Sequence, residues 1–164
     1  MRVMIDIGHP AHVHYFKNLI KLLEEKSHDV FVTARDKEMT HELLNENGID
    51  FYNRGKGGKT FVQKFLYLFK GDFILLKCAL NFKPDIFLSF SSPYAAQASW
   101  VLRKPHVAFT DTEHATLGNL AFSLFSKVVC TPSCYTGSFG KKQKMFNSYM
   151  ELCYLHPNYF TPDP

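Results

Sequence analysis

Histidine side chains follow the first apolar segment of the chain, where a strand gives way to a helix. Residues 2–7 alternate as a buried strand does, and Gly8-His9-Pro10 and His12 come directly after them. Gly8 lets the backbone approach a ligand closely, and the amides at a helix start favour a phosphate or a polarised sugar oxygen. A helix N-terminus disfavours imidazolium, so we predict that His9 is a neutral hydrogen-bonding group or a general base. Pro10 and His12 are predicted to bind the same substrate.

Neither these histidines nor the cysteines predict a metal or a cofactor. His12 and His14 are two positions apart and would point in different directions on a helix, and an equal interpretation is that both cap and pack its first turn. The cysteines lack the paired spacing of a zinc site and are expected to be reduced thiols that mostly pack: Cys78, Cys130, Cys134 and Cys153. No Gly-x-Gly-x-x-Gly fingerprint supports a dinucleotide. We therefore expect no metal and no cofactor.

The densest polar cluster is Asp111-Thr112-Glu113-His114, just past a predicted strand. Two carboxylates and an imidazole at such a point suit a proton-transfer group or an acceptor for a sugar hydroxyl. We predict that Glu113 is catalytic and that Asp111 and His114 bind substrate. The alternative is a solvated loop whose Asp111 or Thr112 caps a helix.

Hydroxyl groups occupy another predicted strand end. Ser91, Ser92 and Tyr94 are predicted to bind ligand hydroxyls, although Ser-Ser-Pro before a helix is also an ordinary N-cap arrangement. No nucleophile-elbow motif surrounds either serine, which argues against hydrolase chemistry.

Strands and helices alternate along most of the chain and must position these groups. We predict strands at 2–7, 29–34, 49–52, 85–90, 106–110 and 127–130. The first helix is predicted to follow the loop 8–11, and the others to span 37–47, 60–82, 94–102 and 117–125. Gly48 is expected to end the second helix, and Gly71-Asp72 to divide 60–82 in two. This order predicts an α/β, Rossmann-like parallel sheet with helices on both faces, and ligands bind at the carboxyl ends of its strands.

Positive charge is concentrated in one segment. Residues 54–83 carry seven basic residues and one acidic residue, a net +6 in a chain of net +4, which leaves −2 elsewhere. This concentration points to one anionic partner surface and not to nucleic acid. Lys64, Phe65, Lys70 and Lys77 are predicted to face an anionic membrane or a lipid-linked acceptor. The alternative is that the helix packs on the sheet with its lysines solvated.

We predict one domain over 1–153, and a proline-rich linker over 154–164 that leads toward an absent C-terminal domain. The chain opens directly into a strand pattern without a secretory signal, and no segment supplies about 20 uninterrupted apolar residues. We therefore expect a cytoplasmic location, with peripheral contact at the inner face of the membrane.

Several segments together resemble one archaeal and bacterial protein family of two-domain length whose function is unknown. They are 5–19, which contains Gly8-His9-Pro10-Ala11-His12, and 32–36, 92–96, 111–115, 131–133 and 154–157. That family is similar to the GT-B superfamily, in which an N-terminal domain holds the acceptor and a C-terminal domain holds the nucleotide sugar. The resemblance places Gly8-His9-Pro10 at the glycine-rich first loop of the peptidoglycan-precursor N-acetylglucosaminyltransferase, and 60–83 at its membrane-facing patch.

A second resemblance concerns residues 110–119, which are similar to a loop of the UDP-N-acetylglucosamine 2-epimerases. Glu113 is the nearest match to their catalytic carboxylate, although the order of residues differs. Those epimerases carry an acid after the fourth strand, where this chain has Ser91-Ser92.

The resulting expectation is the N-terminal half of a GT-B-like glycosyltransferase that acts on a nucleotide sugar and an unknown acceptor and is inactive alone. Transfer would be inverting and metal-independent, with His9 or Glu113 deprotonating or orienting an acceptor hydroxyl. One alternative is an epimerase-like half, which needs a further carboxylate at the cleft. The other is a non-catalytic binding module or a truncated gene product.

Overall fold

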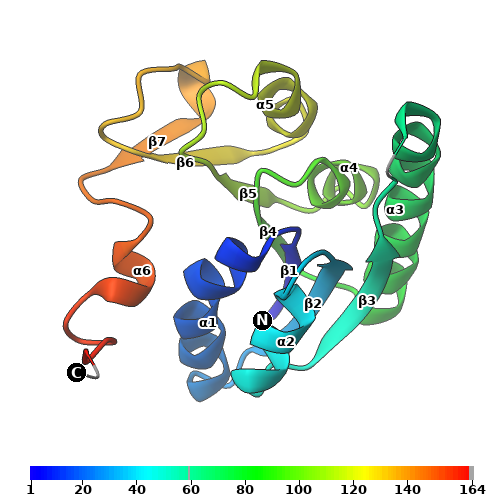
Figure 1. The fold of residues 1–164 in the computed structure, drawn as a ribbon. Coiled ribbons are helices and arrows are strands. Elements are labelled where there is room, and N and C mark those ends of the chain that lie inside the picture. The colour runs from blue at the N-terminus through cyan, green and yellow to red at the C-terminus, as the bar shows by residue number, and fades with distance from the viewer. Residues whose placement is uncertain (59, 163–164) are drawn as a thin grey trace.

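The chain folds around one parallel β-sheet in the computed structural model, which describes residues 1–58 and 60–162. The sheet has seven strands in the order β3-β2-β1-β4-β5-β6-β7 (Figure 1). The strands are β1 (Arg2–Ile7), β2 (Asp29–Asp36), β3 (Phe51–Lys56), β4 (Ile86–Phe90), β5 (His106–Phe109), β6 (Val128–Pro132) and β7 (Gln143–Phe146). All six neighbouring pairs are parallel. The predicted α/β, Rossmann-like fold is confirmed.

Helices cover both faces of the sheet (Figure 1). They are α1 (Pro10–Glu25), α2 (Thr40–Glu46), α3 (Phe61–Phe82), α4 (Pro93–Val101), α5 (Thr116–Ser123) and α6 (Leu152–Leu155), with a 3₁₀ turn, η1 (Gly140–Lys142). Alternate residues of β1 point to opposite faces. Val3, Ile5 and Ile7 pack with α1 and α2, whereas Met4 packs with α3 and α4. No helix in the described ranges has both the length and the apolar character needed to span a membrane.

Side-chain caps fix the starts of α1 and α4, two of the helices that border the candidate site. His9 is the N-cap of α1 and accepts a hydrogen bond from Ala11, with Pro10 in the first turn. Ser92 caps α4 in the same way, by accepting from Ala95. At the other end of a helix, Gly48 has φ +66°, as expected of the residue that ends α2.

The structure corrects three details of the sequence prediction. Helix α3 is continuous, because a single glycine is tolerated inside a helix. Gly71 instead leaves room for the Tyr94 ring, since a Cβ there would lie 2.7 Å from it. Strand β3 extends to Lys56, beyond the predicted 49–52. Strand β7 and helix α6 follow the last predicted strand, 127–130, and neither was predicted, because both are only four residues long.

Candidate functional site

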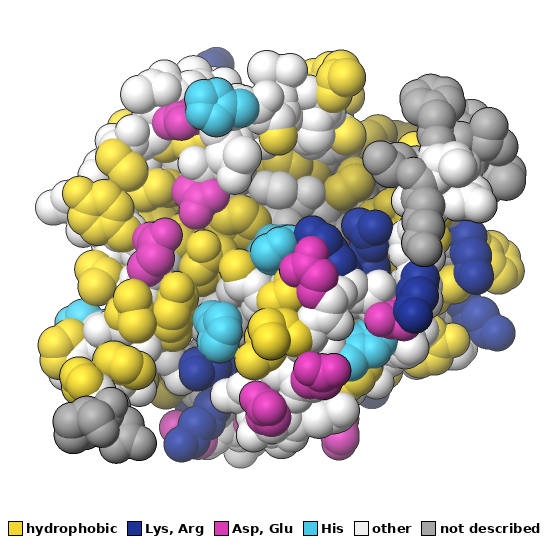
Figure 2. All heavy atoms as spheres, in the orientation of Figure 1, with side chains coloured by type: hydrophobic (Ala, Val, Ile, Leu, Met, Phe, Trp, Pro, Cys, Tyr) yellow, Lys and Arg dark blue, Asp and Glu magenta, His cyan; other side chains and the backbone are white. Residues whose placement is uncertain are grey.

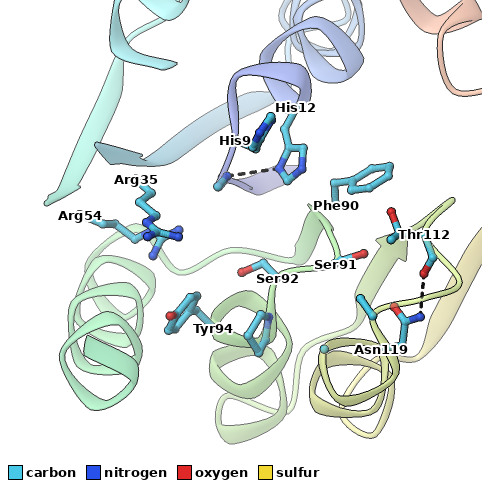
Figure 3. Close-up of a pocket in the computed structure, with 14 residues that line it drawn as sticks. His9, His12, Arg35, Arg54, Phe90, Ser91, Ser92, Tyr94, Thr112 and Asn119 are labelled. Atoms are coloured by element: carbon cyan, nitrogen blue, oxygen red, sulfur yellow. Dashed lines mark hydrogen bonds between the residues drawn. The ribbon is translucent and has the colours of Figure 1, made fainter. Parts of the chain in front are cut away.

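A pocket of about 360 Å³ opens at the carboxyl ends of the central strands (Figure 3). We call it the strand-end pocket. Its lining comes from the loops after β1, β4 and β5, from the ends of β2, β3 and β4, from the first turns of α1 and α4, and from α5. The residues are Gly8, His9, His12, Arg35, Arg54, Phe90, Ser91, Ser92, Pro93, Tyr94, Thr112, Ala115, Gly118 and Asn119. Ligands bind at this edge of open parallel sheets, and the volume lies in the usual range for small-molecule sites.

The two histidines of the pocket are neutral hydrogen-bonding groups. Nδ1 of His9 accepts from the amide of Ala11 at 3.2 Å, and Nδ1 of His12 accepts from the amide of Gly8 at 3.3 Å. Burial, followed by the charge of Lys37, lowers the pKa of His9, and burial lowers the pKa of His12 to about 3. Since each neutral ring carries one proton, that proton resides on Nε2.

His14, the third histidine of this segment, lies elsewhere. Its ring packs on Tyr154, with 5.2 Å between the ring centroids, and it does not line the pocket. Pro10 is buried in the first turn of α1, next to the pocket and not in its lining. In the described part of the chain, no cluster of three or more His, Cys, Asp or Glu side chains has an arrangement that could hold a metal ion.

A buried ion pair lies behind the pocket and was missed by the sequence analysis. Nε and Nη2 of Arg54 lie 2.8 Å and 3.1 Å from the two carboxylate oxygens of Asp6, and both side chains are 1% exposed. Asp6 also accepts from the hydroxyls of Thr33 at 2.7 Å and Ser92 at 2.5 Å. The available signal was an acidic residue inside an otherwise apolar strand, because a buried charge needs a partner.

The predicted residues after β4 all line the pocket, and each has a structural contact as well. Ser92 donates to Asp6 while capping α4, and Ser91 donates to the carbonyl oxygen of Phe109 at 3.3 Å. The Arg54 guanidinium lies 4.9 Å from the ring centroid of Tyr94. Burial raises the pKa of Tyr94 to about 12, so its hydroxyl stays protonated. The N-cap and ligand-binding interpretations are thus compatible at Ser92.

The cluster after β5 lies beside the pocket, with its three ionisable side chains outside the lining. The carboxylate of Glu113 accepts from the amide and hydroxyl of Thr136, at 2.9 Å and 3.2 Å. Asp111 accepts from the hydroxyl of Thr112 at 3.0 Å, and His114 is exposed. Thr112 itself lines the pocket, together with Asn119, which donates to its carbonyl oxygen at 2.8 Å.

The predicted membrane-facing residues lie on α3. Lys70 and Lys77 are exposed, next to Phe69 and Phe73, which are 63% and 69% exposed. The side chains of Lys64 and Phe65 lie outside the described part of the structure. Figure 2 shows Lys and Arg side chains gathered on the β3–α3 side of the visible face and hydrophobic side chains over α6.

This fold is shared with GT-B glycosyltransferases and UDP-GlcNAc 2-epimerases. The TM-score is 0.73 with MurG of Acinetobacter baumannii, at 18% identity over 88% of this chain and 45% of that chain. The TM-score is 0.66 with the UDP-GlcNAc 2-epimerase of Methanocaldococcus jannaschii, at 15% identity over 81% of this chain and 40% of that chain. It is 0.57 with SsfS6, a glycosyltransferase of Streptomyces sp. SF2575, at 14% identity over 80% of this chain and 50% of that chain. The TM-scores show a common fold, and at such low sequence identities they show no common activity.

The chain belongs to the family described as "Protein of unknown function (DUF354)", whose sequence pattern matches residues 1–136. An uncharacterized protein of M. jannaschii is 29% identical over 122 residues, which cover 71% of this chain and 34% of that protein. The chain thus spans about a third of the length of this relative, and half or less of the three solved structures described above.

Proposed function

We propose that this chain forms the acceptor side of a GT-B-type glycosyltransferase that uses a nucleotide sugar. The supporting observation is the strand-end pocket, which combines neutral imidazoles, hydroxyls and an amide at the edge of the sheet where ligands of this fold class bind. Such groups suit a sugar hydroxyl, which both donates and accepts hydrogen bonds. The fold neighbours include enzymes described as binding UDP-GlcNAc, which supports a nucleotide sugar as donor.

Transfer is favoured over epimerisation because the described lining of the pocket contains no Asp or Glu unless the loop between β5 and α5 moves. Epimerisation moves a proton at a sugar carbon, and a carboxylate must be within reach of that proton. The nearest buried carboxylate, Asp6, is occupied by Arg54, Thr33 and Ser92. Glycosyl transfer needs an oriented hydroxyl and a single proton acceptor.

His9 is proposed to contact the acceptor hydroxyl. With Nδ1 engaged by Ala11, the ring offers Nε2–H to the pocket and orients the acceptor as a hydrogen-bond donor. To act as a base, His9 must move its proton to Nδ1 and lose the hydrogen bond from Ala11, at a cost of about 1 kcal/mol. Both roles remain within our proposal, and both require contact between His9 and the acceptor.

Glu113 is proposed as the second candidate for the base. Its carboxylate must leave Thr136 to reach the pocket, and it lies on the loop between β5 and α5 that also supplies Thr112 to the lining. Asp111 and His114, on the same loop, are proposed to contact the substrate if the loop moves in this way.

A second folded unit is proposed to complete the enzyme, and it would bind the donor. Several aromatic and apolar side chains are exposed near α6: Tyr149, Leu152, Leu155, Tyr159 and Phe160. Tyr149, Leu152 and Tyr159 also line a second, largely apolar cavity of about 360 Å³. An apolar surface of this kind is typical of an interface with another domain or protein.

The acceptor is proposed to be lipid-linked or held at an anionic membrane. The exposed phenylalanines of α3, flanked by Lys70 and Lys77, present apolar and basic groups together, which favours an anionic interface. Lys64 and Phe65 are included in this proposal because they lie in the same basic and apolar segment of the sequence.

The experiment compares this 164-residue chain with the longest reading frame that contains it, by isothermal titration with a panel of nucleotide sugars. We expect only the longer protein to bind a nucleotide sugar and to transfer its sugar, with His9→Ala reducing transfer. Binding of a nucleotide sugar by the 164-residue chain would overturn the division into acceptor and donor sides.

A further inference from the structure

A second arginine of the strand-end pocket, Arg35, is held in a defined position. It lies near the end of β2, and its guanidinium carbon is 5.6 Å from the ring centroid of Tyr67. The guanidinium also lies against the backbone of Gly57, where an added Cβ would be 1.9 Å from Nη2. Figure 3 shows Arg35 beside Arg54, at the end of the pocket away from Thr112 and Asn119.

The charge of Arg35 is not compensated within the described part of the chain. No carboxylate there lies within 4.0 Å of its guanidinium, and its buried Nε has no hydrogen-bond partner. The two acids that follow it in sequence form ion pairs elsewhere, Asp36 with Lys56 at 3.9 Å and Glu38 with Lys37 at 3.6 Å. Arg54, in contrast, is neutralised by Asp6.

An uncompensated guanidinium in a concave site favours an anionic ligand. Guanidinium groups bind phosphate and carboxylate through two parallel hydrogen bonds, and a partly desolvated charge gains more from such a partner than an exposed one. Because His9 and His12 are neutral and Arg54 is paired, Arg35 alone sets the net charge of the pocket lining.

We propose that Arg35 binds the oxyanion of the molecule that occupies the strand-end pocket, and that this molecule is a sugar carrying a phosphate or a carboxylate. Its anionic group lies at Arg35, and its hydroxyl groups lie toward Ser91, Thr112 and Asn119 at the opposite, uncharged end. The assignment of this molecule as the acceptor rests on the proposed function. The anion site itself does not.

Gly57 provides a way to displace Arg35 without removing its charge. The atoms that an added Cβ would meet belong to the end of the flexible Arg35 side chain, so Gly57→Ala moves the guanidinium and leaves the backbone in place. Arg35→Gln removes the charge, and Arg35→Lys keeps the charge but not the bidentate geometry. Arg103→Gln is the matched control, because Arg103 is exposed after α4 and does not line the pocket.

The test is isothermal titration of the chain with glucose 1-phosphate and with glucuronate, with glucose as the neutral reference. We expect at least one anionic sugar to bind more tightly than glucose, with an affinity that decreases as salt is added. Arg35→Gln should weaken this binding about tenfold or more. Gly57→Ala should also weaken it, Arg35→Lys should retain more affinity than Arg35→Gln, and Arg103→Gln should not differ from the wild type.

Equal affinity of the wild type and Arg35→Gln for both anionic sugars overturns the proposal, provided that far-ultraviolet circular dichroism shows both proteins folded. Absence of any preference for the anionic sugars over glucose also overturns it. The relative affinities of the two probes identify the group as phosphate or carboxylate. If Arg35-dependent binding is found but the longer protein transfers no sugar, the transfer proposal fails and the anion site stands.

Discussion

Replacing Arg54 with Met should strongly destabilise the protein, although this position lies in the most basic segment of the sequence. The substitution removes two of the four contacts to the Asp6 carboxylate and leaves it with the hydroxyls of Thr33 and Ser92. Both members of the pair are 1% exposed, so the Asp6 carboxylate left without its partner would be poorly solvated. Loss of one partner of a buried pair costs about 3–5 kcal/mol. For a protein of this size, that corresponds to a decrease in Tm of roughly 10 °C.

Urea unfolding at pH 7, followed by circular dichroism, measures this loss. The double variant Asp6→Leu/Arg54→Met should be more stable than either single variant, because it leaves no unpaired buried charge. Arg103→Gln is again the control and should change the free energy of unfolding by less than about 0.5 kcal/mol. A loss below about 1 kcal/mol for Arg54→Met, or a double variant as unstable as the sum of the two single variants, refutes this reasoning.

Three further predictions concern pH, catalysis and membranes. Burial holds the pKa of His106 near 3 in the folded protein, below its usual 6.5. As the pH is lowered from 6.5 toward 3, the unfolded chain binds a proton that the folded protein does not bind, so the stability of the fold decreases. His106→Gln should reduce this dependence by about 1.4 kcal/mol per pH unit near pH 5, and an unchanged slope in urea unfolding contradicts this. Glu113→Gln should lower kcat of the complete enzyme by about 10²–10⁴-fold with little change in Tm, since Glu113 lies in a surface loop; a lower Tm with full activity contradicts its role. Replacing Lys64, Lys70 and Lys77 with Glu should weaken binding to anionic vesicles by about 1 kcal/mol per lysine, and unchanged cosedimentation excludes this surface.

The order of strands and helices was predictable because each strand carries its own apolar pattern. Residues 3–7 are apolar except for Asp6, and a helix follows within three residues. Helix starts at Pro10 and Pro93 follow side chains that can cap. These signals are local, so they identified the loops that border the strand-end pocket without any knowledge of strand order.

Arg54 and Arg35 were not recognised because their environments depend on contacts distant in sequence. Arg54 lies 48 positions from Asp6, and only the pairing of β3 with β2 and of β2 with β1 brings the two together. In the sequence, Arg54 belongs to a concentration of basic residues that suggested an anionic partner surface. The position of Arg35 depends equally on Tyr67 and Gly57, which lie on other elements.

The charge arrangement of the pocket limits how a proton can be removed from an acceptor hydroxyl. His12 has a pKa near 3 and its Nδ1 is engaged by Gly8, while His9 presents Nε2–H, so neither ring offers a free lone pair to the pocket. A change of tautomer at His9 costs about one hydrogen bond, roughly 1 kcal/mol. Displacement of Glu113 from Thr136 costs two hydrogen bonds and requires a movement of its loop. His9 therefore needs the smaller rearrangement to act as the base, and Glu113 needs the larger one. The loss of kcat expected for Glu113→Gln thus requires that the loop between β5 and α5 rearranges when substrate binds.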